Sequence, residues 1–211
     1  MISQIFGGGG NSGAPYRNDF IELFNRGQSS VNVAGWSIQY ASATAATWSV
    51  TNLPPATLAP GQYLLIQEAS GGGNGQTLPT PDAAGTIAMA AAAGKVALVR
   101  TTVALTGTCP SDNNLLDLVG YGSNANCFRG SGPSPAPSNS TAILRGANGC
   151  TDTQRNANDF ATAAPNPRNT STAVNQCPTL LGSTLLFSSR PILDCLGKAG
   201  FGGHSIENPK R

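Results

Sequence analysis

Few residues of the types that usually catalyse reactions are present in this 211-residue sequence, and their spacing matches no catalytic motif. The only histidine is His204, so a Ser-His-Asp or Cys-His arrangement would have to include it. H-E-x-x-H is absent, and a three-histidine zinc site is impossible within one chain. The glycine run at residues 7–10 and the pair Gly94-Lys95 lack the G-K-[ST] sequence of a phosphate-binding loop. These observations predict a protein that is not an enzyme.

Carboxylates are the remaining side chains that could perform acid–base chemistry. A pair of them would suit glycoside hydrolysis, but the sequence does not pair any two. Those that precede residue 177 are Asp19, Glu22, Glu68, Asp82, Asp112, Asp117, Asp152 and Asp159. Glu22 stands out because apolar residues flank it in a strand pattern. We interpret Glu22 as a strand carboxylate that is held by an arginine or by backbone amides.

Residues 151–159 are rich in side-chain oxygens, which makes Asp152 and Asp159 calcium candidates. The segment departs from the EF-hand loop, because Gln154 and Ala157 fit it poorly and no glutamate closes it. Asx turns account for the same composition. We therefore expect no metal or cofactor unless calcium binds at these two aspartates.

Five cysteines are present, and none forms a C-x-x-C pair of the kind found in zinc or thioredoxin-like sites. Cys195 lies in a tail of different composition and is set aside. The other four allow three pairings, of which we favour the sequential one, Cys109 with Cys127 and Cys150 with Cys177. Each such structural disulfide would stabilise the fold by roughly 3 kcal/mol. The alternative is four buried free thiols in a cytosolic protein.

Three aromatic residues, Trp36, Tyr40 and Trp48, could line a sugar-binding face. At strand spacing the commoner role of aromatic side chains is core packing, and we favour that interpretation here.

The composition is unusual in its low content of charged residues, 10%, against about 25% in an average domain. The net charge is only +2 and the arginines are scattered, so nothing indicates a nucleic-acid or anionic-membrane partner. No apolar run approaches the roughly 18 residues of a membrane span. This amino-acid composition is typical of secreted β proteins, although no signal peptide is visible.

Short strand patterns, separated by Gly, Pro and Asn clusters, predict an all-β sandwich or barrel. The clearest patterns are residues 2–6, 19–25, 36–40, 62–67, 95–100, 115–121 and 141–145, the last of which we expect to be the final long strand. We expect a type II turn at Pro60-Gly61, a flexible loop at residues 7–13 and a brief helical turn at the alanine-rich residues 87–93.

Composition changes after Cys177, which divides the chain into a β-domain at residues 1–177 and an atypical C-terminal tail at residues 178–211. We expect the tail to be disordered or not part of the fold.

Several of these segments together resemble the lamin-tail domain. Residues 18–27 (NDFIELFNRG) and 31–38 (VNVAGWSI) resemble its pattern D-[FY]-[IV]-E-L-[YF]-N followed by V-x-L-x-G-W-x-[LI]. Three further segments resemble the later strands of that domain: residues 58–66 (LAPGQYLLI), 95–99 (KVALV) and 117–122 (DLVGYG). Residues 164–169 (APNPRN) match the P-x-P-R-N ending that is common in bacterial members. The resemblance covers residues 2 to about 177.

The resemblance implies an immunoglobulin-like β-sandwich with long polar loops and no family active site, so no catalytic residue can be carried over. Bacterial members are typically exported and stand beside secreted hydrolases or adhesion modules. We therefore expect a non-catalytic extracellular module for adhesion, surface attachment or domain positioning, with a protein, glycan or cell-surface ligand as its partner. The alternative is an accessory N-terminal module of a secreted nuclease or phosphatase whose catalytic domain is absent from this chain.

Overall fold

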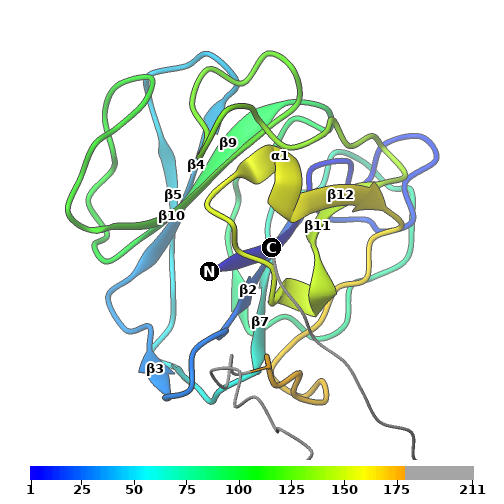
Figure 1. Cartoon of the computed structure of the whole chain (residues 1–211). Coiled ribbons are helices and arrows are strands. Elements are labelled where there is room, and N and C mark those ends of the chain that lie inside the picture. The colour runs from blue at the N-terminus through cyan, green and yellow to red at the C-terminus, as the bar shows by residue number, and fades with distance from the viewer. Residues whose placement is uncertain (179–211) are drawn as a thin grey trace, which may run out of the picture. The chain divides into compact units, whose positions relative to one another are not determined.

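Two β-sheets lie face to face in the computed structural model, which describes residues 1–178 (Figure 1). The first sheet has the strand order β12 (Phe160–Ala163), β11 (Ala142–Arg145), β1 (Ile2–Phe6), β2 (Phe20–Phe24), β7 (Tyr63–Gln67) and β8 (Ala83–Ala84). The second sheet has the order β10 (Leu115–Tyr121), β9 (Gly94–Val99), β4 (Ser37–Ser42) and β5 (Ser49–Asn52). Neighbouring strands are antiparallel except for β7 and β8. The predicted all-β, immunoglobulin-like sandwich is confirmed.

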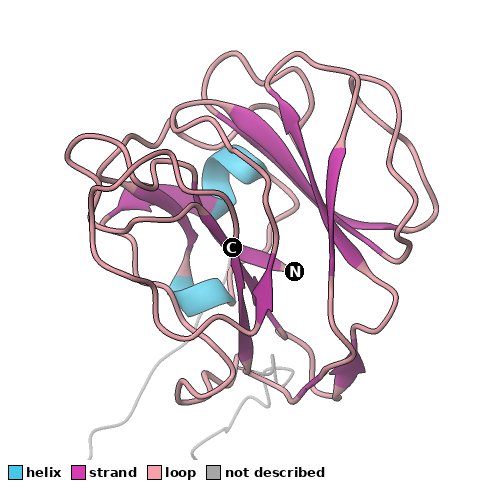
Figure 2. Cartoon of the chain, turned by 180° about the vertical axis from the view of Figure 1, so that it is seen from behind, coloured by secondary structure: helices cyan, strands magenta, loops and turns pink. Residues whose placement is uncertain are grey.

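The remaining elements are short. The strands β3 (Val31–Asn32) and β6 (Thr57–Leu58) form a separate ladder. The helical turns η1 (Ala147–Gly149) and α1 (Asn156–Asp159) stand out among the strands and loops in Figure 2. Neither turn, nor any other helix within residues 1–178, is long and apolar enough to cross a membrane.

The main core lies between the two sheets. Alternate residues of a strand point to the same face, so Ile5 and Ile21 of the first sheet meet Ile38, Val96 and Leu98 of the second. All five side chains are at most 2% exposed. Burial of this apolar surface is the main force that holds the sheets together.

Loops cover the outer faces of both sheets and form two smaller cores. On the first sheet, Phe20 packs with Leu78 of the loop between β7 and β8. On the second sheet, Ala97 packs with Trp48 and Leu105, which belong to loops. Strands β1, β2 and β9 are therefore buried on both faces. The low content of charged residues is consistent with this arrangement, because these strands have no solvent-facing side.

The free edge of β10 is covered by side chains and a neighbouring loop. The amide of Gly120 donates to Asn156 Oδ1, and Asn156 Nδ2 donates to the carbonyl of Leu118. The carbonyl of Gly120 accepts from the amide of Ser134, and the amide of Leu118 donates to Asp117 Oδ1. These bonds satisfy backbone groups that an edge strand would otherwise present to solvent.

The prediction of a flexible loop at residues 7–13 is wrong for its first half, because residues 7–10 are all buried. A Cβ at Gly9 would overlap the carbonyl carbon of Asn18, so glycine is needed there for close backbone approach rather than for mobility. The prediction of a turn at Pro60-Gly61 agrees with the structure, in which Gly61 has a φ of 74°.

Two other local predictions are wrong. The alanine-rich residues 87–93 form no helix; instead the amides of Ile87 and Met89 donate to the buried carboxylates of Glu68 and Asp19. Residues 141–145 are not the final long strand, because β12 follows, has four residues as β11 does, and pairs with it. The tail predicted at residues 178–211 lies outside the described residues from residue 179 onward, which includes Cys195 and His204.

Candidate functional site

Glu22 and Arg168 form a buried ion pair that joins the C-terminal part of the described chain to β2. Arg168 Nη2 donates to Oε1 of Glu22 at 2.7 Å, and Nε and the backbone amide of Arg168 donate to Oε2 at 3.0 and 2.8 Å. Arg168 also donates to the hydroxyl of Tyr63 at 2.9 Å and lies over its ring. Burial raises the pKa of Glu22, and the hydrogen bonds and charge of Arg168 oppose that rise. The interpretation of Glu22 as a carboxylate held by an arginine and a backbone amide is confirmed.

A second buried carboxylate, Asp117 of β10, ties the two sheets together. Arg145 of β11 and Arg129 each donate to one of its oxygens at 3.0 Å. The amide of Ile2 donates to Asp117 Oδ2 at 2.9 Å, and Arg145 Nε donates to the carbonyl of Ile2 at 2.8 Å. The network links β10 of the second sheet to β1 and β11 of the first, so its role in this geometry is structural.

The two calcium candidates, Asp152 and Asp159, lie beside arginine side chains, which leave little room for a metal cation. Both oxygens of Asp159 accept hydrogen bonds, from Thr153 and from the Arg155 amide and Arg145. Burial opposes ionisation of Asp159, but these bonds and the Arg145 charge outweigh it and lower its pKa. Asp152 faces guanidinium nitrogens of three arginines, each at 3.8 Å. These positive charges disfavour calcium at this point. The predicted Asx turn is present, because the amide of Gln154 donates to Asp152 Oδ1.

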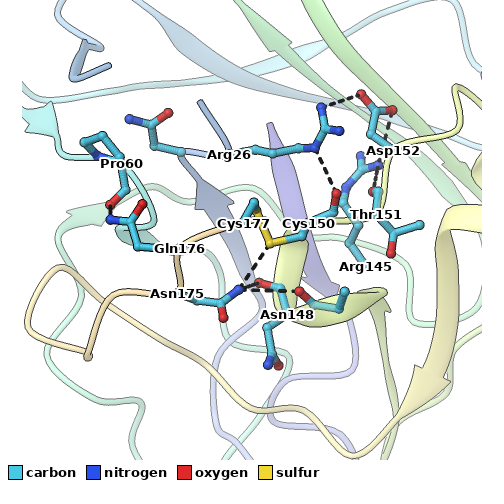
Figure 3. The surroundings of a disulfide bond; sticks show 12 residues. Arg26, Pro60, Arg145, Asn148, Cys150, Thr151, Asp152, Asn175, Gln176 and Cys177 are labelled. Carbon is cyan, nitrogen blue, oxygen red and sulfur yellow. Dashed lines mark hydrogen bonds and ion pairs between the residues drawn. A yellow bond between two sulfur atoms is a disulfide. The ribbon is translucent and has the colours of Figure 1, made fainter. Parts of the chain in front are cut away.

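Cys150 and Cys177 lie side by side, with Cα atoms 5.5 Å apart, within the range of a disulfide. Figure 3 shows the pair between Asn175, whose Nδ2 donates to the Cys150 sulfur, and Arg26, whose Nε donates to the Cys150 carbonyl. Gln176, which precedes Cys177, donates from Nε2 to the carbonyl of Pro60 at 3.0 Å. The pair therefore fastens the chain that follows Arg168 to the loops of the first sheet.

Cys109 and Cys127 form the other pair, with Cα atoms 5.0 Å apart. Beside them lies Lys95, a buried residue of β9. Its ammonium group donates to the carbonyls of Ala45 and Thr108 at 2.8 and 2.6 Å and to Asn126 Oδ1 at 2.8 Å. It thus joins three loops, two of them next to the cysteines. Burial lowers the pKa of Lys95.

A cavity with a volume of about 190 Å³ opens at one end of the sandwich. Its lining is apolar apart from Asn25 and contains no Asp, Glu, Lys or Arg: Met1, Leu23, Asn25, Val31, Val33, Trp36, Leu58, Leu98 and Leu116. The Arg100 guanidinium lies 5.9 Å from the Trp36 ring centroid. Such a cavity can receive a small apolar group.

The three aromatic residues do not share one face. Tyr40 lies in the core between the sheets and Trp48 in the core outside the second sheet. Trp36 is half-buried and lines the cavity. Core packing is confirmed for Tyr40 and Trp48, and the half-buried Trp36 also packs against the main core while it lines the cavity.

The sequence did not identify the partners that complete these networks. Arg168 stands in the P-N-P-R-N segment that was noted only as a family ending. Arg145 belongs to the strand pattern at residues 141–145, and Lys95 is the first residue of the strand pattern at residues 95–100. Neither pattern indicates the role of the charged side chain. The distance along the chain is greatest for Arg168 and Glu22, which are 146 residues apart.

Comparison with known proteins agrees with the architecture. The family model of the Lamin Tail Domain matches residues 1–123, which is more than half of the chain. No curated protein matches the sequence. The family consists of immunoglobulin-like domains without catalytic activity, and its architecture agrees with the sandwich. The chain belongs to the lamin tail domain family.

Proposed function

We propose that this chain is a non-catalytic module that acts outside the cytoplasm in binding, adhesion or the positioning of a neighbouring domain. Its partner would be a protein, a glycan or a cell-surface ligand. The observation that carries the proposal is the state of the carboxylates, because each of the eight in residues 1–178 accepts a hydrogen bond from the chain itself. Five of the eight are also buried, and buried groups engaged in this way hold the fold together rather than face a substrate: Asp19, Glu22, Glu68, Asp117 and Asp159.

The cysteine pairs support the extracytoplasmic part of this proposal. Disulfides form and persist in oxidising compartments and are rare in the cytosol. Four cysteines that lie in two pairs with disulfide geometry would gain the stabilisation only after export.

Two measurements test the proposal. First, the purified chain is incubated with phosphodiester and phosphomonoester substrates, and we expect no hydrolysis above a heat-unfolded control. Turnover that is lost on unfolding would show that the chain is an enzyme. Second, cells that express the full gene are fractionated and their thiols trapped before lysis. We expect the protein outside the cytoplasm with both pairs oxidised; a cytoplasmic protein with free thiols at Cys109, Cys127, Cys150 and Cys177 would contradict the proposal.

A further inference from the structure

One segment of the described chain is bound to the first sheet without joining its hydrophobic packing. Residues 164–176, which we call the strap, run from β12 to Cys177 and are drawn in yellow to orange in Figure 1. None of the three clusters of buried apolar side chains in residues 1–178 includes a strap residue, and Val174 of the strap is 54% exposed. The sheets therefore complete their apolar packing without the strap.

Side chains of the first sheet and its loops hold the strap through its backbone. Gln4 of β1 donates from Nε2 to the carbonyl of Asn166 and accepts from the amide of Asn166, both at 2.8 Å. Gln62, which precedes β7, donates from Nε2 to the carbonyl of Thr170 at 3.0 Å. The strap itself is not a strand of the described sheets. Hydrogen bonds to the main chain of an extended segment are also the means by which a domain binds a peptide of another molecule.

Arg168, the only charged residue of the strap, enters a pocket on the outer face of the first sheet. Glu22 lies on the same face of β2 as Phe20 of the outer core, and Ser3 Oγ donates to Glu22 Oε1 at 2.6 Å. The carboxylate is therefore oriented by the sheet as well as by the strap. The Arg168 guanidinium donates to both oxygens of Glu22 and lies 3.9 Å from the Tyr63 ring centroid. A carboxylate beside an aromatic face selects arginine over lysine.

Two prolines keep the strap extended. Pro165 and Pro167 are both buried and have fixed φ angles, and a residue that precedes proline is disfavoured in a helical conformation. A segment that is already extended loses little conformational entropy when it binds. The strap therefore presents Arg168 in the same way whether it comes from the same chain or from another molecule.

The far end of the strap is held by the pair Cys150 and Cys177. Beside this pair, the amide of Asn175 donates to the carbonyl of Gly61 at 2.8 Å. When the pair is closed, the strap begins and ends beside its own sheet. When the pair is open, only the chain at β12 ties the strap covalently to the domain, and the extended segment can reach about 45 Å from there. The pair therefore determines whether the strap can reach another molecule.

We propose that the outer face of the first sheet is a peptide-binding groove with an arginine pocket formed by Ser3, Glu22 and Tyr63. The chain fills this groove with its own strap, and the strap of a second copy fills it when the cysteine pair is open and copies are crowded. The contacts are the same in both cases, so the local concentration of copies decides between them. The proposal rests on the binding role proposed above and names its partner, a proline-flanked arginine segment of a second copy.

The first test adds a peptide of residues 164–176 to the full chain with Arg168→Ala, in dithiothreitol. This variant keeps the pocket but lacks the side chain that fills it. The peptide should bind at least about 100-fold more tightly than the same peptide with Arg168→Ala, because only the former restores the buried ion pair. Wild-type protein with its cysteine pair closed is the matched control and should bind neither peptide.

If the Arg168→Ala chain does not fold alone, the unaltered peptide should restore its folded circular dichroism spectrum and the altered peptide should not. Equal binding of the two peptides, or neither binding nor restored folding, would overturn the proposal. Neither readout involves hydrolysis or export, so failure here is distinguishable from failure of the proposed function.

The second test asks whether another copy supplies the strap. Glu22→Gln keeps the strap arginine but alters the pocket, and Arg168→Ala does the reverse. In dithiothreitol each variant alone should sediment as a monomer, and their mixture should form a 1:1 dimer. Cys150→Ser/Cys177→Ser keeps both parts and replaces the mixture if either variant does not fold. Its dimer fraction should rise with concentration and fall when the peptide is added in excess. A sample that stays monomeric in the experiment used would overturn the assignment of a second copy.

Discussion

Removal of the Arg168 guanidinium should be strongly destabilising, because it leaves the Glu22 carboxylate buried without a counter-charge. Glu22 is 0% exposed and three hydrogen bonds from Arg168 reach its oxygens. The Arg168→Ala change keeps the hydrogen bond from the backbone amide to Glu22. It removes the two hydrogen bonds from the guanidinium group and the contact with Tyr63. Breaking a buried ion pair by removing one partner costs about 3–5 kcal/mol. For a domain of this size the melting temperature should fall by about 6–20 °C.

The assay is urea and thermal unfolding followed by circular dichroism at neutral pH, with Arg17→Ala as the control. Arg17 is exposed, so its truncation should change the free energy of unfolding by no more than about 0.5 kcal/mol. The double variant Glu22→Gln/Arg168→Met should be more stable than Arg168→Ala, because it removes the unpaired charge as well. A loss of less than about 1 kcal/mol in Arg168→Ala would refute this reasoning, since the pair would then be no stronger than an exposed one.

Three further changes test other parts of the fold. Cys150→Ser/Cys177→Ser opens a loop of 27 residues and should lower the free energy of unfolding by about 3.5 kcal/mol in the chain-entropy model; an unchanged urea midpoint under oxidising conditions would contradict it. Lys95→Met removes three hydrogen bonds from a charged donor to partly buried acceptors and should cost about 1–3 kcal/mol; it should also speed reduction of the neighbouring cysteine pair by dithiothreitol, and equal reduction rates would argue against the role of Lys95. Gly9→Ala forces a Cβ onto the Asn18 carbonyl and should cost about 1–3 kcal/mol by overpacking, which a wild-type melting temperature would disprove.

The strands could be predicted from sequence because local chemistry determines them. Alternation in residues 36–40 and the turn at Pro60-Gly61 depend on side chains only a few positions apart, and both match the structure. The glycine run at residues 7–10 was misread because its meaning depends on Asn18, which lies close only in the folded chain. Flexibility and tight packing require the same residue, and composition alone does not separate them.

The sequence could predict that buried charged residues need partners, but not which residues those partners are. That Glu22 would need a partner followed from its apolar neighbours, but the choice of Arg168 depends on how the last segment returns to β2. The alanine-rich residues 87–93 show the converse case, in which helix propensity was overridden by tertiary contacts. Their amides satisfy Glu68 and Asp19, and a helical turn would have withdrawn those donors.

The covered edge of β10 bears on how copies of this domain behave when they are crowded. An open strand edge pairs readily with a strand of another molecule, which leads to strand exchange and fibres. Here the backbone groups of Leu118 and Gly120 are already bonded to Asp117, Asn156 and Ser134. A second chain would first have to displace these bonds within one molecule. Copies held close together, in tandem or in an array, would therefore stay separate at this edge.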